Sequence, residues 1–162
     1  MTRPVSTTYL EMTSPDQLRP SARTVPGFEV RQVEIPLSAL NRWLYEIVGA
    51  EWQWFGKLEW SDEKWQRWVD RPELQTWIGY LHGTPAGYFE LEYQSDDNVE
   101  IAYFGLLPQF FGRGLGGPFL TRAIQCAWAM GAIRIRVHTC TLDHPSALAN
   151  YQARGLQIYN RG

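Results

Sequence analysis

The chain has 162 residues, a net charge of −2 and a pI near 5.9, with 44% hydrophobic and 20% charged residues. This composition is typical of one soluble globular domain and excludes a strongly basic nucleic-acid-binding protein. No apolar run approaches the ~20 residues that a membrane-spanning helix needs. The polar N-terminus offers no signal-peptide pattern, so the sequence predicts a cytoplasmic protein.

The first part of the chain predicts an extension, a strand and two helices. Residues 1–27 are rich in Pro, Ser and Thr, so we expect an N-terminal extension that is loose or draped over the surface, ahead of a single domain over residues 28–162. Phe28–Glu34 alternates apolar and polar residues like a strand. Apolar residues at helical spacing predict a helix over Leu37–Val48 that Gly49 ends, and a cap with an acidic first turn predicts a second helix over 61–69.

The middle of the chain predicts three strands. Leu74–Gln94 is rich in aromatic and apolar strand formers on both sides of the turn residues His82–Pro85, which is the pattern of a hairpin. A further strand, Val99–Leu107, ends before Pro108. Strict alternation predicts that Val99, Ile101 and Tyr103 share one face of this strand, with Glu100, Ala102 and Phe104 on the other.

The C-terminal part of the chain places four glycines within six residues, directly before a helix. Apolar residues recur every three or four positions over 119–128, which predicts a core-facing helix that Gly131 ends. Ile133–Cys140 alternates like a strand, and a last helix is expected from Pro145 to Gly155. Little or nothing remains for a final strand.

The two cysteines indicate neither a disulfide nor a metal site. Cys126 falls in a predicted helix and Cys140 in a predicted strand, and they form no CxxC pair, so we expect two buried free thiols. No set of His, Cys and carboxylate residues has the spacing of metal ligands, so no metal is expected.

The glycines, Gly112, Gly114, Gly116 and Gly117, predict a phosphate-binding loop. A strand that leads through a glycine-rich turn into a helix presents several amide hydrogens in one direction, and the helix dipole adds positive potential. Arg113 can add a charge-assisted contact to the same anion. The spacing also matches the dinucleotide fingerprint GxGxxG, but only one strand and one helix follow, too little for a dinucleotide-binding sheet. A glycine-rich turn without a ligand is the other interpretation.

Two segments resemble one known family. The run Leu106-x-Pro108-x-x-Phe111-Gly112-Arg113-Gly114-Leu115-Gly116 is similar to the strand end and pyrophosphate loop of the GNAT superfamily, the Gcn5-related N-acetyltransferases. The run Ala147-x-x-x-Tyr151-x-x-Arg154-Gly155-Leu156 is similar to the late helix of that family. The family's first loop position, Gln or Arg, is taken by Phe111 in one register and by Gln109 in another. His144 stands where the family often has Asn.

The resemblance implies an α/β fold with a mixed, mostly antiparallel sheet, a splayed parallel strand pair and flanking helices. It implies acetyl-CoA as the acyl donor, with the pantetheine arm between the strands that end near Leu106 and Thr139. Main-chain groups of Phe104 and Leu106 would pair with that arm. The remaining coenzyme contacts that it implies are Phe111, Gly112, Arg113, Gly114, Leu115, Gly116 and His144.

Acyl transfer to an amine needs a base and benefits from an acid. A free alkylammonium has a pKa of about 10.4, so a carboxylate or a carboxylate–water relay is expected to take its proton. Glu100, on the central predicted strand, is the first candidate, and Glu90, Glu92 and His138 remain open. The resemblance implies Tyr151 as the general acid beside the departing thiolate.

The sequence is least informative about the acceptor. Six of the eight tryptophans lie in the first two predicted helices and their connection, where an aromatic pocket could hold a cation. We therefore predict an N-acetyltransferase acting on a primary amine of a small molecule or peptide, with no nucleic-acid or membrane partner and with a homodimer left open. The alternative is a non-catalytic acyl-CoA-binding sensor or assembly module, followed by a nucleotide-binding protein.

Overall fold

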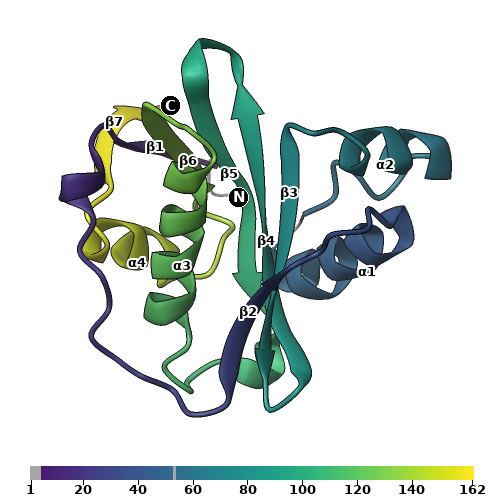
Figure 1. Ribbon diagram of the computed structural model, residues 1–162, viewed down its shortest axis with the longest axis horizontal. Helices are drawn as coiled ribbons and strands as arrows, with labels where there is room; N and C mark the ends of the chain where they lie inside the picture. Colours follow the sequence, from purple (N-terminus) through teal and green to yellow (C-terminus); the bar gives the residue numbers. More distant parts are fainter. Residues whose placement is uncertain (1–4, 53) are drawn as a thin grey trace.

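In the computed structural model, described for residues 5–52 and 54–162, helices cover both faces of one seven-stranded sheet (Figure 1). The strands lie in the order β2-β3-β4-β5-β6-β1-β7, and every neighbouring pair is antiparallel except β5 and β6. The predicted α/β fold, a mostly antiparallel sheet with one parallel pair, is confirmed. The strands are β1 (Thr7–Met12), β2 (Phe28–Gln32), β3 (Leu74–Leu81), β4 (Thr84–Gln94), β5 (Asn98–Leu106), β6 (Arg134–Cys140) and β7 (Gln157–Arg161).

The α-helices lie close to where the sequence predicts them. They are α1 (Ser38–Gly49), α2 (Asp62–Val69), α3 (Gly116–Ala129) and α4 (Ala147–Ala153). Ser61 caps α2 by accepting a hydrogen bond from the Lys64 N–H at 3.2 Å. α1 ends at Gly49 as predicted, and the chain continues into the short 3-10 turn η2 (Ala50–Trp52). The other 3-10 turns are η1 (Pro15–Gln17), η3 (Ser95–Asp97) and η4 (Pro108–Phe110).

Both ends of the described chain enter the same sheet. β1 pairs with β6 on one side and with β7 on the other, and its side chains Leu10 and Met12 are fully buried. The expectation of a loose or draped lead is therefore wrong for Thr7–Met12, and the expectation of no final strand is wrong for Gln157–Arg161. Residues 1–4 of the expected extension lie outside the described part of the chain.

The parallel pair opens along its length. β5 and β6 are paired only where Asn98–Glu100 faces Arg134–Arg136, and beyond these residues the two strands separate. A bulge shifts the register between β4 and β5 after Ile101, so Phe104 joins Ile101 in the core under α3 while Tyr103 turns to the α1 side. The strict alternation expected along this strand is wrong beyond the bulge.

The main hydrophobic core lies between the sheet and the α3–α4 layer. It is centred on buried side chains of β4, β5 and β6 packed against Phe119, Leu120 and Ile124 of α3. A smaller core lies between the sheet and α1, around Leu44 and Tyr88.

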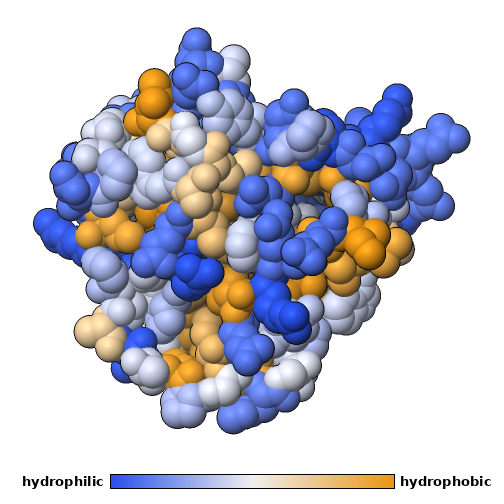
Figure 2. All heavy atoms as spheres, viewed as in Figure 1, coloured by the Kyte–Doolittle hydropathy of each residue, from blue (hydrophilic) through white to orange (hydrophobic). Residues whose placement is uncertain are grey.

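Figure 2 shows a mainly hydrophilic surface on the face turned to the viewer, with separate hydrophobic patches, one of them over α1. Both cysteines are free, with Cys126 buried and Cys140 half-buried, and no helix in the described part of the chain could cross a membrane.

Candidate active site

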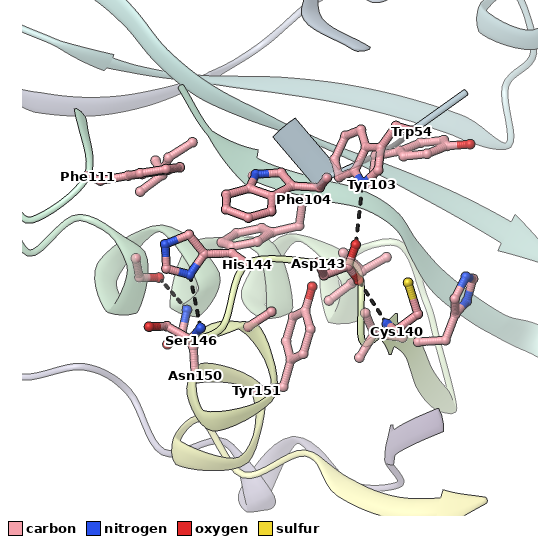
Figure 3. Close-up of a pocket in the computed structure, with 18 of the residues that line it drawn as sticks. Trp54, Tyr103, Phe104, Phe111, Cys140, Asp143, His144, Ser146, Asn150 and Tyr151 are labelled. Atoms are coloured by element: carbon pink, nitrogen blue, oxygen red, sulfur yellow. Dashed lines mark hydrogen bonds between the residues drawn. The ribbon is translucent and has the colours of Figure 1, made fainter. Parts of the chain in front are cut away.

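The separated strands open onto a large cavity. Its volume is about 770 Å³, and its walls come from β5, the glycine loop, β6, α4 and the connection between α1 and α2 (Figure 3). A cavity of this size is within the range of small-molecule sites in proteins. Because it lies where β5 and β6 part, the strand edges that face it carry main-chain groups that no neighbouring strand pairs with.

The glycine loop forms one end of this cavity. Gly112 and Gly114 both have positive φ, 76° and 77°, a conformation that residues with a Cβ adopt only with strain. α3 begins directly after the loop, and the Asn150 amide of α4 donates to the Gly116 carbonyl oxygen at 3.0 Å, which fixes the two helices to each other here. The loop therefore places backbone N–H groups and the positive end of a helix dipole at the mouth of the cavity.

The structure brings nearly all of the expected coenzyme contacts to this cavity. Arg113 is the exception, since its guanidinium lies over the Phe110 ring, 5.6 Å from the centroid. His144 packs edge-on against Phe111 with ring centroids 4.8 Å apart, and its Nδ1 accepts a hydrogen bond from the Ser146 N–H at 2.9 Å. The expected residues that line the cavity are Phe104, Leu106, Phe111, Gly112, Gly114, Leu115, Gly116 and His144.

Tyr151 of α4 points its hydroxyl into the cavity (Figure 3). The residue is buried, with 6% of its surface exposed, and its ring lies 6.3 Å from that of Phe104. No described residue forms a hydrogen bond with its hydroxyl. Burial, helped by the nearby Asp143 carboxylate, raises its pKa, so the phenol holds its proton at neutral pH. The hydroxyl is thus an available proton donor inside the cavity.

Asp143 connects the two sides of the opening. Its carboxylate accepts hydrogen bonds from the Thr139 hydroxyl at 2.6 Å and from the Cys140 N–H at 3.0 Å, both on β6. Across the cavity, the Trp54 indole N–H donates to the same carboxylate at 3.4 Å (Figure 3). Asp143 therefore links the end of β6 to the α1–α2 connection. Sequence reasoning did not single it out, because nothing in the local sequence marks an aspartate that bridges segments 89 residues apart.

Glu100 and His138 form a pair on neighbouring strands. His138 lines the cavity, whereas Glu100 lies behind it with its carboxylate 3.2 Å from His138 Nδ1. Burial raises the pKa of Glu100, but hydrogen bonding to His138 and Gln94 outweighs this effect and leaves the pKa below its ordinary value. Hydrogen bonding to Glu100 raises the pKa of His138. Of the four candidate bases, only His138 lines the cavity.

Glu90 and Glu92 are held in other contacts. Glu90 is 1% exposed and accepts hydrogen bonds from the Asn41 amide at 2.7 Å and the Trp68 indole at 2.9 Å. Burial raises its pKa. Glu92 forms an ion pair with Arg71 at 2.7 Å. These contacts place both carboxylates in the packing between the sheet and α1–α2.

The clustered tryptophans enclose a cation that belongs to the chain itself. The Lys57 Nζ lies 3.4 Å from the Trp68 ring centroid, 4.4 Å from that of Tyr103 and 4.6 Å from that of Trp60, with Trp65 at 5.6 Å. It forms no hydrogen bond with any described residue, and burial lowers its pKa to about 8. Trp52 and Trp54 line the cavity instead. The aromatic cluster was visible in the sequence, but Lys57 as its occupant was not.

Comparisons with known proteins agree with this geometry. The model of the acetyltransferase (GNAT) family matches residues 42–156. The chain is 29% identical over 157 aligned positions to a mycothiol acetyltransferase of Corynebacterium aurimucosum, covering 83% of this chain and 50% of that protein. It therefore spans about half the length of that curated relative.

Solved structures share the fold at low sequence identity. A GCN5-related N-acetyltransferase from Sphaerobacter thermophilus superposes with a TM-score of 0.74 at 17% identity, over 98% of this chain and 50% of that one. An IAA acetyltransferase from Bacillus cereus superposes with a TM-score of 0.62 at 21% identity, over 82% and 79% of the two chains.

Proposed function

Because the chain belongs to the GNAT acetyltransferase family, we propose that it transfers the acetyl group of acetyl-CoA to a primary amine of a small molecule or peptide. The observation that carries this proposal is the cavity between the separated ends of β5 and β6, which joins the glycine loop at one end to the Tyr151 hydroxyl. One site of this kind supplies anion-binding amides, unpaired strand edges and a proton donor together.

The unpaired edge of β5 suits an extended arm. Beyond Glu100 this strand has no partner on the β6 side, so main-chain groups near Phe104 and Leu106 are free to pair with the pantetheine amides. The glycine loop at the strand end would then receive the phosphates. This arrangement supports the coenzyme contacts expected from the sequence and orients the thioester toward α4 and β6.

His138 and Glu100 act as a pair in the proposed reaction. The His138 imidazole faces the cavity and takes the amine proton as the nitrogen attacks the thioester carbonyl carbon. Glu100 holds the imidazole through Nδ1 and stabilises the imidazolium that forms. Glu100 thus contributes to base catalysis as a positioning residue, behind the histidine.

Tyr151 is the proposed general acid. When the carbon–sulfur bond breaks, the departing thiolate takes the phenolic proton. The raised pKa of Tyr151 keeps this proton on the phenol at neutral pH but makes the phenol a weaker acid than the thiol, so the transfer depends on placing the hydroxyl within hydrogen-bond reach of the sulfur, and the phenolate then regains a proton from solvent.

The test measures thiol release from acetyl-CoA over a panel of polyamines, aminoglycosides, amino acids and peptides. For an accepted amine, Tyr151→Phe is expected to lower kcat by about 100-fold while the affinity for acetyl-CoA is kept. Tyr159→Phe, at an exposed tyrosine, is the matched control and keeps full activity. Acetyl-CoA binding without turnover of any amine by the wild-type chain would contradict the enzyme and support the non-catalytic acyl-CoA-binding module.

A further inference from the structure

The segment between β1 and β2 runs along the glycine loop and the start of α3, beside the residues that line the cavity. In Figure 1 it descends past α4 and passes below the start of α3 before β2 begins. The Arg19 N–H donates to the Arg154 carbonyl oxygen at 2.8 Å, and the Ser21 N–H donates to the Thr121 hydroxyl of α3 at 3.0 Å. Val25 then packs against the cluster of buried residues that contains Leu115 of the glycine loop. The segment is therefore fixed on both sides of Arg23.

Arg23 lies directly against the glycine loop. A Cβ built at Gly114 would overlap the Arg23 guanidinium and stand 2.9 Å from its Cζ atom. Gly117, in the first turn of α3, also has close neighbours. A Cβ there would stand 2.9 Å from Arg154 Nη1 and 3.0 Å from the Ser21 hydroxyl. These glycines leave room for two arginines that come from distant parts of the sequence.

No carboxylate in the described part of the chain forms an ion pair with the arginines at this turn. Arg23, Arg113 and Arg154 form none of the salt bridges found in the described part of the chain. The Arg154 Nε atom is buried and has no hydrogen-bond partner among the described residues. Two of these guanidinium groups lie beside the N-terminus of α3, where the helix dipole adds positive potential. An unpaired buried donor and clustered like charges are destabilising unless an anion joins them.

We propose that Arg23 is a phosphate-binding residue of the coenzyme site. Its guanidinium donates to the diphosphate or to the 3′-phosphate of coenzyme A, at the loop that ends in α3. The inference rests on the proposed function, and it adds a ligand from a segment that neither the glycine motif nor the late helix contains. Arg23 lies 91 residues before Gly114 in the chain, so the β1–β2 segment completes the phosphate site from outside the family's motif.

The experiment measures the dissociation constants of CoA and dephospho-CoA by calorimetry. Arg23→Ala is expected to weaken CoA binding by about tenfold, the loss that follows from removing one charge-assisted hydrogen bond to a phosphate. If the contact is to the diphosphate, dephospho-CoA shows the same loss. If the contact is to the 3′-phosphate, Arg23→Ala binds dephospho-CoA as tightly as the wild-type chain does. Either result supports the proposal.

Arg19→Ala is the matched control, because it removes the same charge from the same segment at an exposed side chain and keeps the Arg19 N–H contact. It is expected to change CoA affinity by less than about twofold. The proposal is overturned if Arg23→Ala binds CoA like the wild-type chain, or if Arg19→Ala weakens binding equally. Neither outcome touches the proposed function, which fails instead if the wild-type chain binds no CoA. Thermal unfolding of both variants checks that the fold is kept.

Discussion

The two sides of the cavity are built in different ways. The proposed donor side is formed by residues close in sequence, because the end of β5, the glycine loop and the start of α3 follow one another over about 20 residues. The proposed acceptor side is assembled from Tyr45 of α1, the connection around Trp54, and strands β5 and β6. A local motif can therefore locate the first side, whereas the second side is determined by packing between segments that no local pattern connects.

The two sides also differ in how they handle charge. At the donor side, arginines lie beside backbone amides without a paired carboxylate. At the acceptor side, Glu100 is paired with His138, and next to this side the aromatic cluster encloses Lys57. The first side therefore suits the charged phosphates of the proposed coenzyme, and the second carries the pair proposed for proton transfer. The variants below test each side separately.

The largest effect is expected from a side chain placed in the glycine loop. Gly114→Val puts a Cβ at a residue with positive φ and fills the space that Arg23 occupies. Two or more charge-assisted hydrogen bonds to phosphate are then lost, so the affinity for acetyl-CoA is expected to fall roughly 1,000-fold. Calorimetric titration measures this. Gly131→Val is the control, since Gly131 also has a positive φ, 91°, but has open space around it. Equal losses in both variants would mean that strain in the fold, and not the site, is responsible.

A smaller but more specific effect is expected at the acceptor side. His138→Gln removes the proposed base and lowers kcat by roughly 100-fold, with acetyl-CoA affinity kept. Steady-state kinetics at saturating acetyl-CoA, with calorimetry beside it, separates the two quantities. If the acetyl-CoA affinity falls as much as kcat does, His138 contributes to coenzyme binding, and the proposal that it is the base is contradicted.

The pH profile tests the pairing of His138 with Glu100. The carboxylate raises the pKa of His138, so kcat/KM falls as the pH drops through that raised value. Glu100→Gln removes the charge that stabilises the imidazolium, so the acid limb of the profile moves to lower pH. If the acid limb of the Glu100→Gln profile stays in place, a group other than His138 takes the proton. That group cannot be Glu100, because the variant lacks its carboxylate.

The smallest effect is one of stability. Burial lowers the pKa of Lys57 to about 8, against 10.5 for the free side chain, so the unfolded chain holds more protons between these values. The free energy of unfolding therefore rises with pH in this window, and relative to Lys57→Met the wild-type chain gains about 2 kcal/mol from pH 7 to pH 10. Urea unfolding of both proteins at each pH measures the difference. A constant difference would show that Lys57 titrates normally in the folded chain.

The helices and the donor loop follow from the sequence because their signals are local. Gly112 and Gly114 have positive φ as the loop motif requires, Gly131 and Gly155 end their helices with positive φ, and Ser61 caps α2. The predicted element bounds differ from the structure by a few residues. Strand pairing was harder to predict, because β1 is as short and polar as a surface segment and becomes buried only between β6 and β7.

The candidate base shows the same limit at a single residue. Glu100 stood out in the sequence as an isolated acid on a central strand, yet His138 occupies the cavity wall in front of it. Which of the two side chains lines the cavity depends on the short parallel pairing of β5 with β6, because this pairing sets the positions of Glu100 and His138 relative to each other.

By itself the sequence determined the backbone conformations that individual residues favour: glycine turns, caps, apolar helix faces, and hence the family and the donor loop. Only the tertiary structure decided which distant segments contact one another. It placed β1 inside the sheet, Lys57 among the indoles and Arg23 beside Gly114. The physical reason is that conformational preference acts between neighbours in the chain, whereas burial and charge pairing act between neighbours in space.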